Sequence, residues 1–317
     1  MSSTSTTTSA VAVAATADMD AQPSISSPMP ARSTTTTPAS HTPAHTPTVT
    51  PSRSLFSKYT DQYVVPAHLA PAALQICITA FPLGLVAGLV LPRALGFLVD
   101  RATSLVSSND SANAAQATTF GSWYTLPQLH LYLLAWCTFH LLEFVITAAY
   151  NPTRLFSDSF LLNNGLAYHV AHVAGLVEFG ITATLAGPAS GWKRPGLSTL
   201  VGLILVVVGQ SIRSLAMIHA HNNFSHIVAF RKRDDHQLVK TGVYAFTRHP
   251  SYFGFFYWAL GTQILLGNPL GCLAFSIVLW RFFAHRIRVE EKHLIEFFKD
   301  EYVQYKKDVG THLPFIP

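Results

Sequence analysis

Five apolar stretches, each long enough to cross a lipid bilayer or to form a pair of shorter crossings, constrain this chain more than any other feature. Lipid offers no hydrogen-bond partners to the backbone, so a crossing segment must be a helix or part of a closed barrel. Only 12% of the residues are charged, whereas soluble domains have about 25%. The sequence therefore predicts an all-α fold, a polytopic transmembrane helical bundle.

Prolines and polar turns divide these stretches into six expected spans. Residues 252–284 contain Gly267-Asn268-Pro269 at their middle, and because proline ends helices we expect a hairpin of two short helices there. The first run, interrupted by Pro82 and Pro92, is interpreted as one span, with two short helices as the alternative. A polar linker is expected over residues 93–127. The four spans before the hairpin are expected near residues 72–91, 129–150, 166–185 and 197–219.

The N-terminal 60 residues differ in composition from the rest of the chain. They are rich in serine, threonine, alanine and proline, as in ARSTTTTPASHTPAHTPTVTPS. Such a segment cannot bury enough apolar surface to offset the entropy that folding would remove. It also lacks the basic segment and apolar core of a signal peptide. We therefore expect a disordered tail over residues 1–60 and one membrane domain over residues 61–317.

Lysine and arginine lie unevenly on the two sides that the expected spans define, and positively charged loops usually face the cytosol. We therefore expect both termini to be cytosolic, together with the polar parts at residues 220–251 and 285–317. The net charge of +5 is then explained by contacts with the lipid bilayer, and we expect no nucleic-acid partner. The opposite side carries only Arg93, Arg101, Lys193 and Arg194.

Four polar side chains interrupt the apolar runs: Glu143, Glu178, Gln210 and Arg213. An ionisable group at membrane depth costs free energy and is usually paired or functional. We favour an internal pair that locks two helices together, such as Glu178 with Arg213. A polar cavity or a proton path is the alternative.

Three histidines, His219, His221 and His226, lie near the end of the fourth expected span. No carboxylate partners them at helical spacing, so we interpret them as interfacial side chains and expect no metal site. All three cysteines fall inside apolar runs, where small buried side chains are the usual interpretation.

Two polar clusters flank the last apolar block. The first is HQLVKTGVYAFTRHPSY at residues 236–252, where Gly242 permits a tight turn and Pro250 favours a helix that starts beside it. The second is RIRVEE, which begins at Arg286 just beyond the block. Because the hairpin returns the chain to the same side of the membrane, we expect the two clusters to close over one ligand at the membrane surface.

The residues and spacing of these clusters are similar to those of one family. HQLVKTGVYAFTRHPSYFGFFYWALGTQILLGNP and RFFAHRIRVEEKHLIEFFKDEYVQYKK, followed by LPFIP, closely resemble protein-S-isoprenylcysteine O-methyltransferases. The connection NPTRLFSDSFLLNN resembles the one before the third core span in that family. A lone RHP tripeptide would be a weak signal, but RHPSYFGF, GTQILLGNP and the paired glutamates occur together. The resemblance covers residues 129–317.

The resemblance implies a reaction, a methyl donor and a class of partner. Members of the family transfer a methyl group from S-adenosylmethionine to the C-terminal carboxylate of a prenylated cysteine. This completes the maturation of CaaX proteins, such as small GTPases, at the endoplasmic reticulum membrane. Residues 61–317 are then expected to form a membrane methyltransferase domain with a cytosolic cofactor-binding region at its C-terminal end.

The resemblance also implies roles for individual residues. Arg286 is implied to bind the substrate carboxylate, and Glu290, on the same helix face, to contact the cofactor. Spacing alone would favour a surface ion pair between these two residues. Ala229 departs from the family, because many members have a cofactor-binding glutamine at that position. The other implied cofactor contacts are His236, Gln237, Leu238, Val239, Tyr244, His249, Pro250, Ser251 and Tyr252.

The chemistry agrees with this set of residues. A C-terminal carboxylate has an ordinary pKa of about 3.3–3.7 and is ionised at neutral pH, so no general base is needed. An arginine can hold it through its planar guanidinium. A prenyl chain is stable in lipid and must reach the site through a lateral opening between spans. Such an opening could be lined by Phe253, Phe255, Phe256, Tyr257 and Trp258, although packing is the commoner role for such rings.

Three other functions are compatible with parts of the sequence. A phospholipid amine methyltransferase would use the same cofactor without a site for a carboxylate. A sterol reductase would use a nicotinamide cofactor at a comparable polar C-terminal region. A transporter or scaffold would place Glu178 and Arg213 on a polar path.

Overall fold

The computed structural model describes residues 69–106, 123–186, 193 and 195–317. In these residues the chain forms helices joined by loops, with one isolated β-bridge between Leu313 and Ile316. The predicted all-α fold is confirmed for this part of the chain. The disordered tail expected over residues 1–60 lies outside the described residues.

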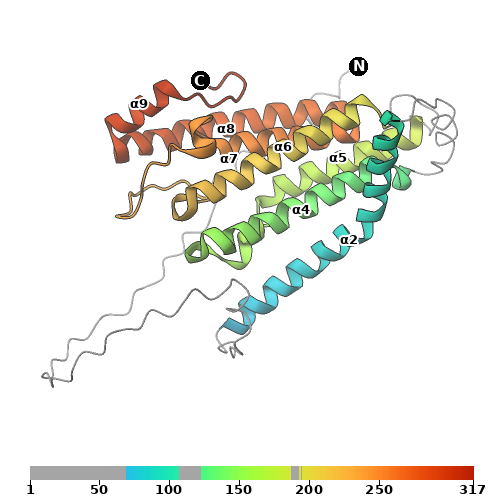
Figure 1. Ribbon diagram of the computed structural model, residues 1–317, viewed down its shortest axis with the longest axis horizontal. Coiled ribbons are helices and arrows are strands. Elements are labelled where there is room, and N and C mark those ends of the chain that lie inside the picture. Colours follow the sequence, from blue (N-terminus) through green and yellow to red (C-terminus); the bar gives the residue numbers. More distant parts are fainter. Residues whose placement is uncertain (1–68, 107–122, 187–192, 194) are drawn as a thin grey trace, which may run out of the picture.

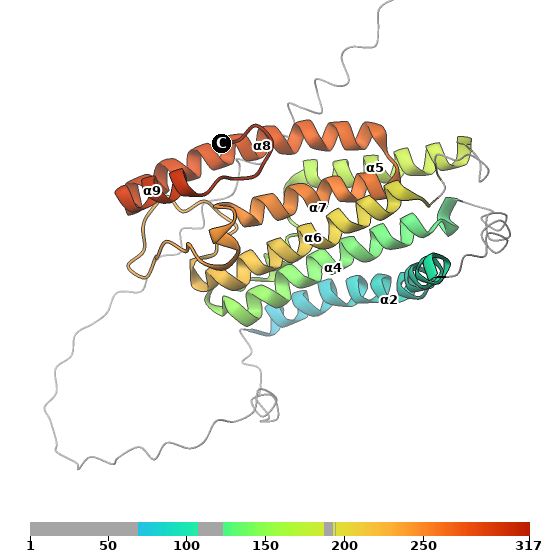
Figure 2. The same cartoon turned by 45° about the horizontal axis from the view of Figure 1, so that its top comes forward.

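Seven α-helices make up most of the described chain. They are α2 (Ala70–Val106), α4 (Pro127–Tyr150), α5 (Gly165–Ala186), α6 (Leu197–Ala220), α7 (Pro250–Leu266), α8 (Pro269–Phe298) and α9 (Asp300–Asp308). Helices α4 to α8 lie side by side with their axes roughly aligned, and α2 lies along α4 (Figure 1, Figure 2). Short 3₁₀ turns are η3 (Trp123–Thr125), η4 (Pro152–Arg154), η5 (Ser157–Phe160), η6 (His221–Asn223) and η7 (Gly242–Ala245).

The helices have the lengths that a membrane bundle requires. By length and composition, five stretches in the described part can cross a membrane, and they coincide with α2, α4, α5, α6 and α8. Helix α7 is shorter, with 17 residues, and it packs against both α6 and α8. The polar site described below lies where α7 begins and where α8 leaves its apolar part.

Helix α2 is longer than the sequence indicates. We expected a span at residues 72–91 and a polar linker from residue 93, but the helix continues to Val106 with Pro82 and Pro92 inside it. Proline removes one backbone hydrogen bond and bends a helix without always ending it, and Figure 1 shows that α2 bends along its course. Arg93 and Arg101 in the continuation reach the start of α4 and the segment before α6, which holds it in place.

The chain turns back between α7 and α8, at the Gly267-Asn268-Pro269 sequence. Gly267 has a φ of +65°, a conformation that strains other residues, and it ends α7. Pro269 occupies the first position of α8, where its missing N–H costs nothing. Lys193 closes the turn, because its Nζ donates to the carbonyl oxygens of Leu266 at 3.0 Å and Gly267 at 2.8 Å. A cation at the C-terminal end of α7 also interacts favourably with the dipole of that helix.

Glu178 and Arg213 do not pair, so that prediction is wrong. The Glu178 carboxylate in α5 accepts hydrogen bonds from the backbone N–H groups of Leu270 at 3.0 Å and Gly271 at 2.7 Å. These groups belong to the first turn of α8 and have no partner within that helix. Arg213 in α6 pairs instead with Glu143 in α4. Glu178 therefore joins α5 to α8, and Glu143 joins α4 to α6. Each carboxylate locks two helices together, although the pair expected from the sequence does not form.

Glycines let α6 and α7 approach each other closely. A methyl group placed on Gly209 in α6 would lie 2.6 Å from the carbonyl oxygen of Gly254 in α7. One placed on Gly261 in α7 would lie 2.9 Å from the carbonyl oxygen of Gly202 in α6. Close backbone contact through small residues is a common way for membrane helices to associate, because apolar side chains gain little by leaving lipid. This contact fixes α7, whose first turn belongs to the site.

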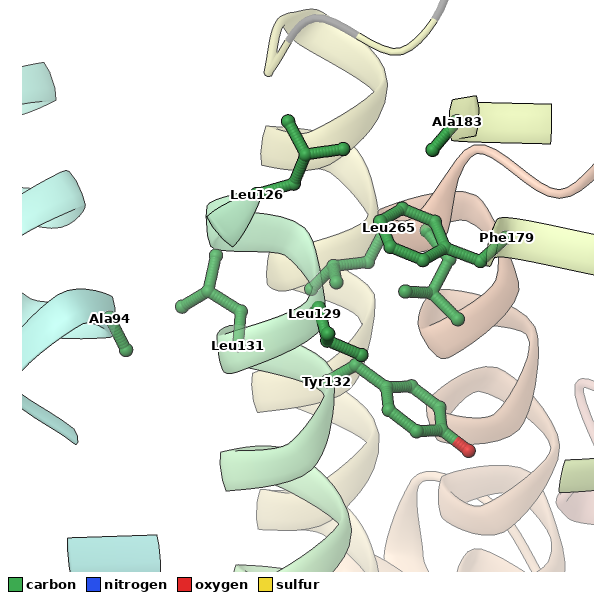
Figure 3. Close-up of a cluster of buried hydrophobic side chains, with 9 residues drawn as sticks. Ala94, Leu126, Leu129, Leu131, Tyr132, Phe179, Ala183 and Leu265 are labelled. Carbon is green, nitrogen blue, oxygen red and sulfur yellow. The ribbon is translucent and has the colours of Figure 1, made fainter. Parts of the chain in front are cut away.

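A cluster of buried side chains joins the helices at the other end of the bundle. Figure 3 shows Tyr132 from α4, Phe179 from α5 and Leu265 from α7 meeting in this cluster, with Ala94 of α2 nearby. The Tyr132 hydroxyl lies 2.7 Å from Nδ1 of His172, so the polar atom that this ring brings into the core has a partner. The cluster holds α5 against α4 and α7.

Gly209→Leu is expected to lower the apparent Tm of the purified protein in detergent, because the new side chain meets the α7 backbone. Overpacking of this kind costs about 1–3 kcal/mol. The matched control is Gly180→Leu in α5, where a methyl group placed on the glycine meets nothing within 4 Å. A thermal-shift assay compares both variants with the wild type, and equal stability of the two variants would contradict a tight α6–α7 contact.

Candidate functional site

One large cavity lies between the loop that follows α6, the start of α7, and helices α5 and α8. Its volume is about 1070 Å³. Every residue that the sequence assigns to the cofactor or the substrate lines this cavity, so the two polar clusters meet in space. These residues are His236, Gln237, Leu238, Val239, Tyr244, His249, Pro250, Ser251, Tyr252, Arg286 and Glu290.

The loop before α7 is shaped by a glycine and by a histidine of α6. Gly242 has a φ of +62°, and a methyl group placed on it would overlap the ring of His219 at Nδ1. That same nitrogen accepts a hydrogen bond from the backbone N–H of Val243 at 3.1 Å. His219 is therefore a support for the loop, where the sequence suggested an interfacial residue. On the far side of the loop, the Tyr305 hydroxyl of α9 donates to the Tyr244 carbonyl oxygen at 2.6 Å.

Glu291 anchors the start of α7 to α8. Its Oε1 accepts from Nε of Arg248 at 2.6 Å and lies 3.3 Å from Nε2 of His249. Its Oε2 accepts from Nζ of Lys306 in α9 at 2.5 Å. The side chains of Arg248 and Glu291 are 1% and 7% exposed, so this is a buried ion pair. The sequence alone does not reveal it, because these two residues lie far apart in the chain and only the folded hairpin brings them together.

Tyr252 joins the residues predicted to bind the substrate and the cofactor. Its hydroxyl accepts from Nε of Arg286 at 2.8 Å and donates to Oε2 of Glu290 at 2.5 Å. The Arg286 guanidinium also donates from Nη2 to the His226 carbonyl oxygen and lies 5.5 Å from the centre of the Tyr252 ring. The direct surface ion pair between Arg286 and Glu290 that spacing favours is thus replaced by a partly buried bridge through a phenol.

A buried ion pair lies beneath the start of α7. Arg213 of α6 donates from Nη2 to Oε2 of Glu143 at 3.0 Å and from Nη1 to the Ser251 hydroxyl at 3.0 Å. Its guanidinium also lies 5.2 Å from the ring centre of Phe139 and 5.4 Å from that of Phe255. Both charged residues stand out in the sequence as unusual, but the sequence does not connect them. Their pairing holds Ser251, one of the predicted cofactor contacts, from below.

The rest of the cavity is an apolar channel between α5 and α8. Side chains on both of these helices are strongly exposed along the channel, including Val170 at 43% and Leu270 at 72%, so the space between α5 and α8 is open. Of the five aromatic residues that could have lined such an opening, only Phe255 lines the cavity. Trp258, for example, is 0% exposed and packs inside the bundle, the role that the sequence favours for such rings. The channel is lined by Ala167, Val170, Ala171, Ala174, Val177, Ile181, Leu270, Gly271, Ala274, Phe275, Val278 and Phe282.

Comparison with known proteins points to one family. Residues 201–296 match the model of the isoprenylcysteine carboxyl methyltransferase (ICMT) family. The chain is 50% identical over 190 residues to protein-S-isoprenylcysteine O-methyltransferase of Saccharomyces cerevisiae, a match that covers 59% of this chain and 80% of the relative. Identity to the Homo sapiens enzyme of the same name is 44% over 185 residues, covering 58% and 64% of the two chains.

A solved structure gives the same result for the fold. It is described as the structure of the eukaryotic intramembrane Ras methyltransferase ICMT without a monobody. The two structures superpose with a TM-score of 0.57 at 30% sequence identity, covering 74% of this chain and 98% of the other.

Two neighbouring glutamates are expected to differ in their effect on stability. Glu291→Gln removes the charge that Arg248 and Lys306 share inside the protein, and breaking a buried ion pair costs about 3–5 kcal/mol. Glu290 faces the cavity, so Glu290→Gln is expected to change the stability much less. Apparent Tm values of the two variants in detergent test this, and a Glu291→Gln variant as stable as the wild type would contradict the anchoring role.

Proposed function

This chain belongs to the isoprenylcysteine carboxyl methyltransferase family, and we propose that it takes the methyl group from S-adenosylmethionine. Methylation of the C-terminal carboxylate of a prenylated cysteine is the activity of the chain. The observation that carries the proposed site is the bridge through Tyr252, which joins Arg286 to Glu290 beside an apolar channel. A carboxylate site, a cofactor site and a channel for a lipid chain are what this reaction needs in one place.

Arg286 is the proposed holder of the substrate carboxylate. The carboxylate is already ionised at neutral pH, so the task of the protein is to orient one oxygen toward the methyl group. A guanidinium is planar and can hold a carboxylate with two parallel hydrogen bonds. The hydrogen bond from Arg286 to Tyr252 fixes the plane of the guanidinium. In the reaction the oxygen–carbon bond forms, the carbon–sulfur bond breaks, and no proton needs to move.

The polar end of the cavity has the groups that S-adenosylmethionine requires. When bound, this cofactor supplies a methyl group on a positively charged sulfur. Glu290 offers a carboxylate to cationic or hydroxyl groups, and the rings of His249 and Tyr252 are stacked 5.4 Å apart and nearly parallel. Burial lowers the pKa of His236, with Arg233 acting in the same direction, so its ring is a neutral hydrogen-bonding group at pH 7. Aromatic faces also favour a neighbouring cation.

The channel between α5 and α8 is the proposed site of the prenyl chain. Each buried CH₂ group contributes about 0.8 kcal/mol to partitioning into an apolar phase, so the chain does not leave lipid without an apolar route. The side opening provides this route, and the small residues Ala167, Ala171, Ala174 and Ala274 leave width for a branched chain.

The three alternative functions have less support. The relatives named above are all carboxyl methyltransferases of isoprenylcysteine, which favours this reaction over phospholipid methylation and sterol reduction. The transporter alternative relied on a polar path through Glu178 and Arg213. These two residues have separate partners, one in the first turn of α8 and the other in α4.

The proposed setting is the endoplasmic reticulum membrane, with the site and both termini in the cytosol. The distribution of lysine and arginine supports this orientation. Proposed substrates are processed CaaX proteins such as small GTPases, whose prenyl chain already resides in the cytosolic leaflet. Incubation of membranes that contain the protein with labelled S-adenosylmethionine and N-acetyl-S-farnesylcysteine should yield a base-labile methyl ester. Absence of that methyl ester from membranes that contain the folded protein would contradict the proposal.

Variants of Arg286 are expected to lose turnover while keeping cofactor affinity. Arg286→Ala should reduce kcat/KM for N-acetyl-S-farnesylcysteine on the order of a hundredfold or more, because an oriented charged contact is lost. Arg286→Lys should restore little, since an ammonium cannot form the planar pair of hydrogen bonds. Arg288→Ala, an exposed arginine on the same helix, is the matched control. Steady-state kinetics with both substrates varied give the result.

Glu290→Gln is expected to show the opposite pattern. It should weaken binding of S-adenosylhomocysteine, measured by calorimetric titration into the purified variant, because the carboxylate is the group proposed to contact the cofactor. If Arg286→Ala abolishes this binding while Glu290→Gln preserves it, the two roles are reversed.

Ala274→Phe is expected to narrow the channel and to affect long chains most. At a rise of about 1.5 Å per residue, Ala274 lies about 18 Å along α8 from Arg286. With carbon–carbon bonds of about 1.5 Å an isoprene unit extends about 5 Å, and the sulfur that carries the chain lies about 4 Å from the carboxylate. The end of a farnesyl chain therefore comes level with Ala274, whereas a geranylgeranyl chain must pass it. Activity ratios for the two prenylcysteines measure the effect. Leu273→Phe, at a neighbouring position that is 60% exposed outside the channel, should leave the ratio unchanged.

A further inference from the structure

The segment that follows α9 folds back along α8, as Figure 2 shows, and the proposed function does not use it. Residues 309–317 are called the strap below. Leu313 of the strap is 4% exposed and belongs to a buried cluster with Phe283 and Ile287 of α8. Phe315, two residues further on, is 93% exposed. The strap therefore has an inner face that packs on the bundle and an outer face that does not.

Hydrogen bonds fasten the strap to the end of the loop before α7. The backbone N–H of Arg248 donates to the Gly310 carbonyl oxygen at 3.1 Å, and Nη1 of Arg248 donates to the Val309 carbonyl oxygen at 2.8 Å. The Thr247 hydroxyl donates to the Thr311 carbonyl oxygen at 2.8 Å. Both threonines are buried, so water does not compete for their hydrogen bond. The strap is thus fixed to the residues that lead into the first turn of α7.

The strap supports both rings that stack on Tyr252. The Tyr252 ring centre lies 5.4 Å from that of His249 and 5.1 Å from that of Phe283, with the planes 6° and 29° apart. His249 directly follows Arg248, which is hydrogen-bonded to the strap, and Phe283 shares its buried cluster with Leu313. The place of the Tyr252 ring therefore depends on the strap through a polar contact and through an apolar one.

The hydroxyl of this ring bridges Arg286 and Glu290, so a shift of the ring changes the alignment of both. We propose that Leu313, which lies outside the cavity lining, is a positioning residue for methyl transfer. Its side chain fills the cluster that contains Phe283 and thereby keeps the Tyr252 hydroxyl between the two groups. A misplacement of about 1 Å caused far from the reacting atoms can lower a rate about a hundredfold. The inference rests on the proposed roles of Arg286 and Glu290.

The test measures steady-state kinetics of Leu313 variants with both reactants varied. Leu313→Ala should lower kcat for N-acetyl-S-farnesylcysteine on the order of tenfold, while the KM of each reactant changes by less than about threefold. The reason is that each reactant keeps its own contacts, whereas the alignment between them is lost. Leu313→Met conserves the volume and should keep most of kcat. Leu313→Val leaves a smaller gap, should give an intermediate kcat, and supplies the result if Leu313→Ala does not fold.

Two control variants separate positioning from stability. Leu131→Ala removes the same side chain from the buried cluster at the other end of the bundle, where Leu131 is 3% exposed. It should lower the apparent Tm about as much as Leu313→Ala, because both leave a cavity, but keep the kcat of the folded protein. Phe315→Ala removes the exposed ring of the same strap and should change neither quantity.

The outcomes distinguish a positioning role from a general effect on folding. An unchanged kcat in Leu313→Ala, or a loss of the same size in Leu131→Ala, would overturn the positioning role. A loss confined to KM would overturn it as well, because Leu313 would then affect binding and not alignment. Full activity of both Arg286→Ala and Glu290→Gln would contradict the proposed site itself, whatever the Leu313 variants show.

Discussion

The buried pair between Glu143 and Arg213 is the interaction on which the active end of the bundle depends. It joins α4 to α6, and through the Ser251 hydroxyl it also reaches the first turn of α7. Two charges in an apolar bundle are stable only with each other, because either one alone would be a charge without solvation. The pair therefore excludes arrangements in which these helices slide or rotate by one residue. The glycine contact between α6 and α7 then brings the two backbones close enough for Arg213 to reach Ser251.

A second layer of charges controls how α8 meets α7. Glu291 holds Arg248 and Lys306, while its neighbour Glu290 points into the cavity and is reached by Tyr252. Adjacent residues on a helix face different directions, so one glutamate serves the fold and the other belongs to the proposed site. Since Tyr252 also binds Arg286, a small displacement of α8 changes the proposed substrate and cofactor contacts together. In this way the position of one helix sets the geometry of the proposed site.

The sequence was informative where a simple physical rule or a specific motif acts, and uninformative where partners depend on the fold. Bilayer thickness determines the length of an apolar helix, and α4, α5, α6 and α7 lie over the expected ranges, whereas α2 and α8 continue beyond theirs. The site residues predicted between His236 and Tyr252 line one cavity together with Arg286 and Glu290. The partner of Arg213 was not predictable, because Glu143 and Glu178 look alike in the sequence and only the helix arrangement distinguishes them. Likewise, the residues of α5 that line the channel look like any apolar helix face in the sequence, because only the fold places α8 opposite them.

The side opening of the channel has a consequence for how the enzyme meets its substrate. By the proposed route a prenylated chain enters between α5 and α8 without passing through water, so the encounter takes place by diffusion in the plane of the bilayer. The quantity that governs the rate is then the number of substrate molecules per area of membrane, whereas the methyl donor is supplied from solution in three dimensions. Adding inert lipid to the same vesicles would dilute one reactant and leave the other unchanged. An affinity for the lipid substrate is therefore meaningful only as a mole fraction in the membrane.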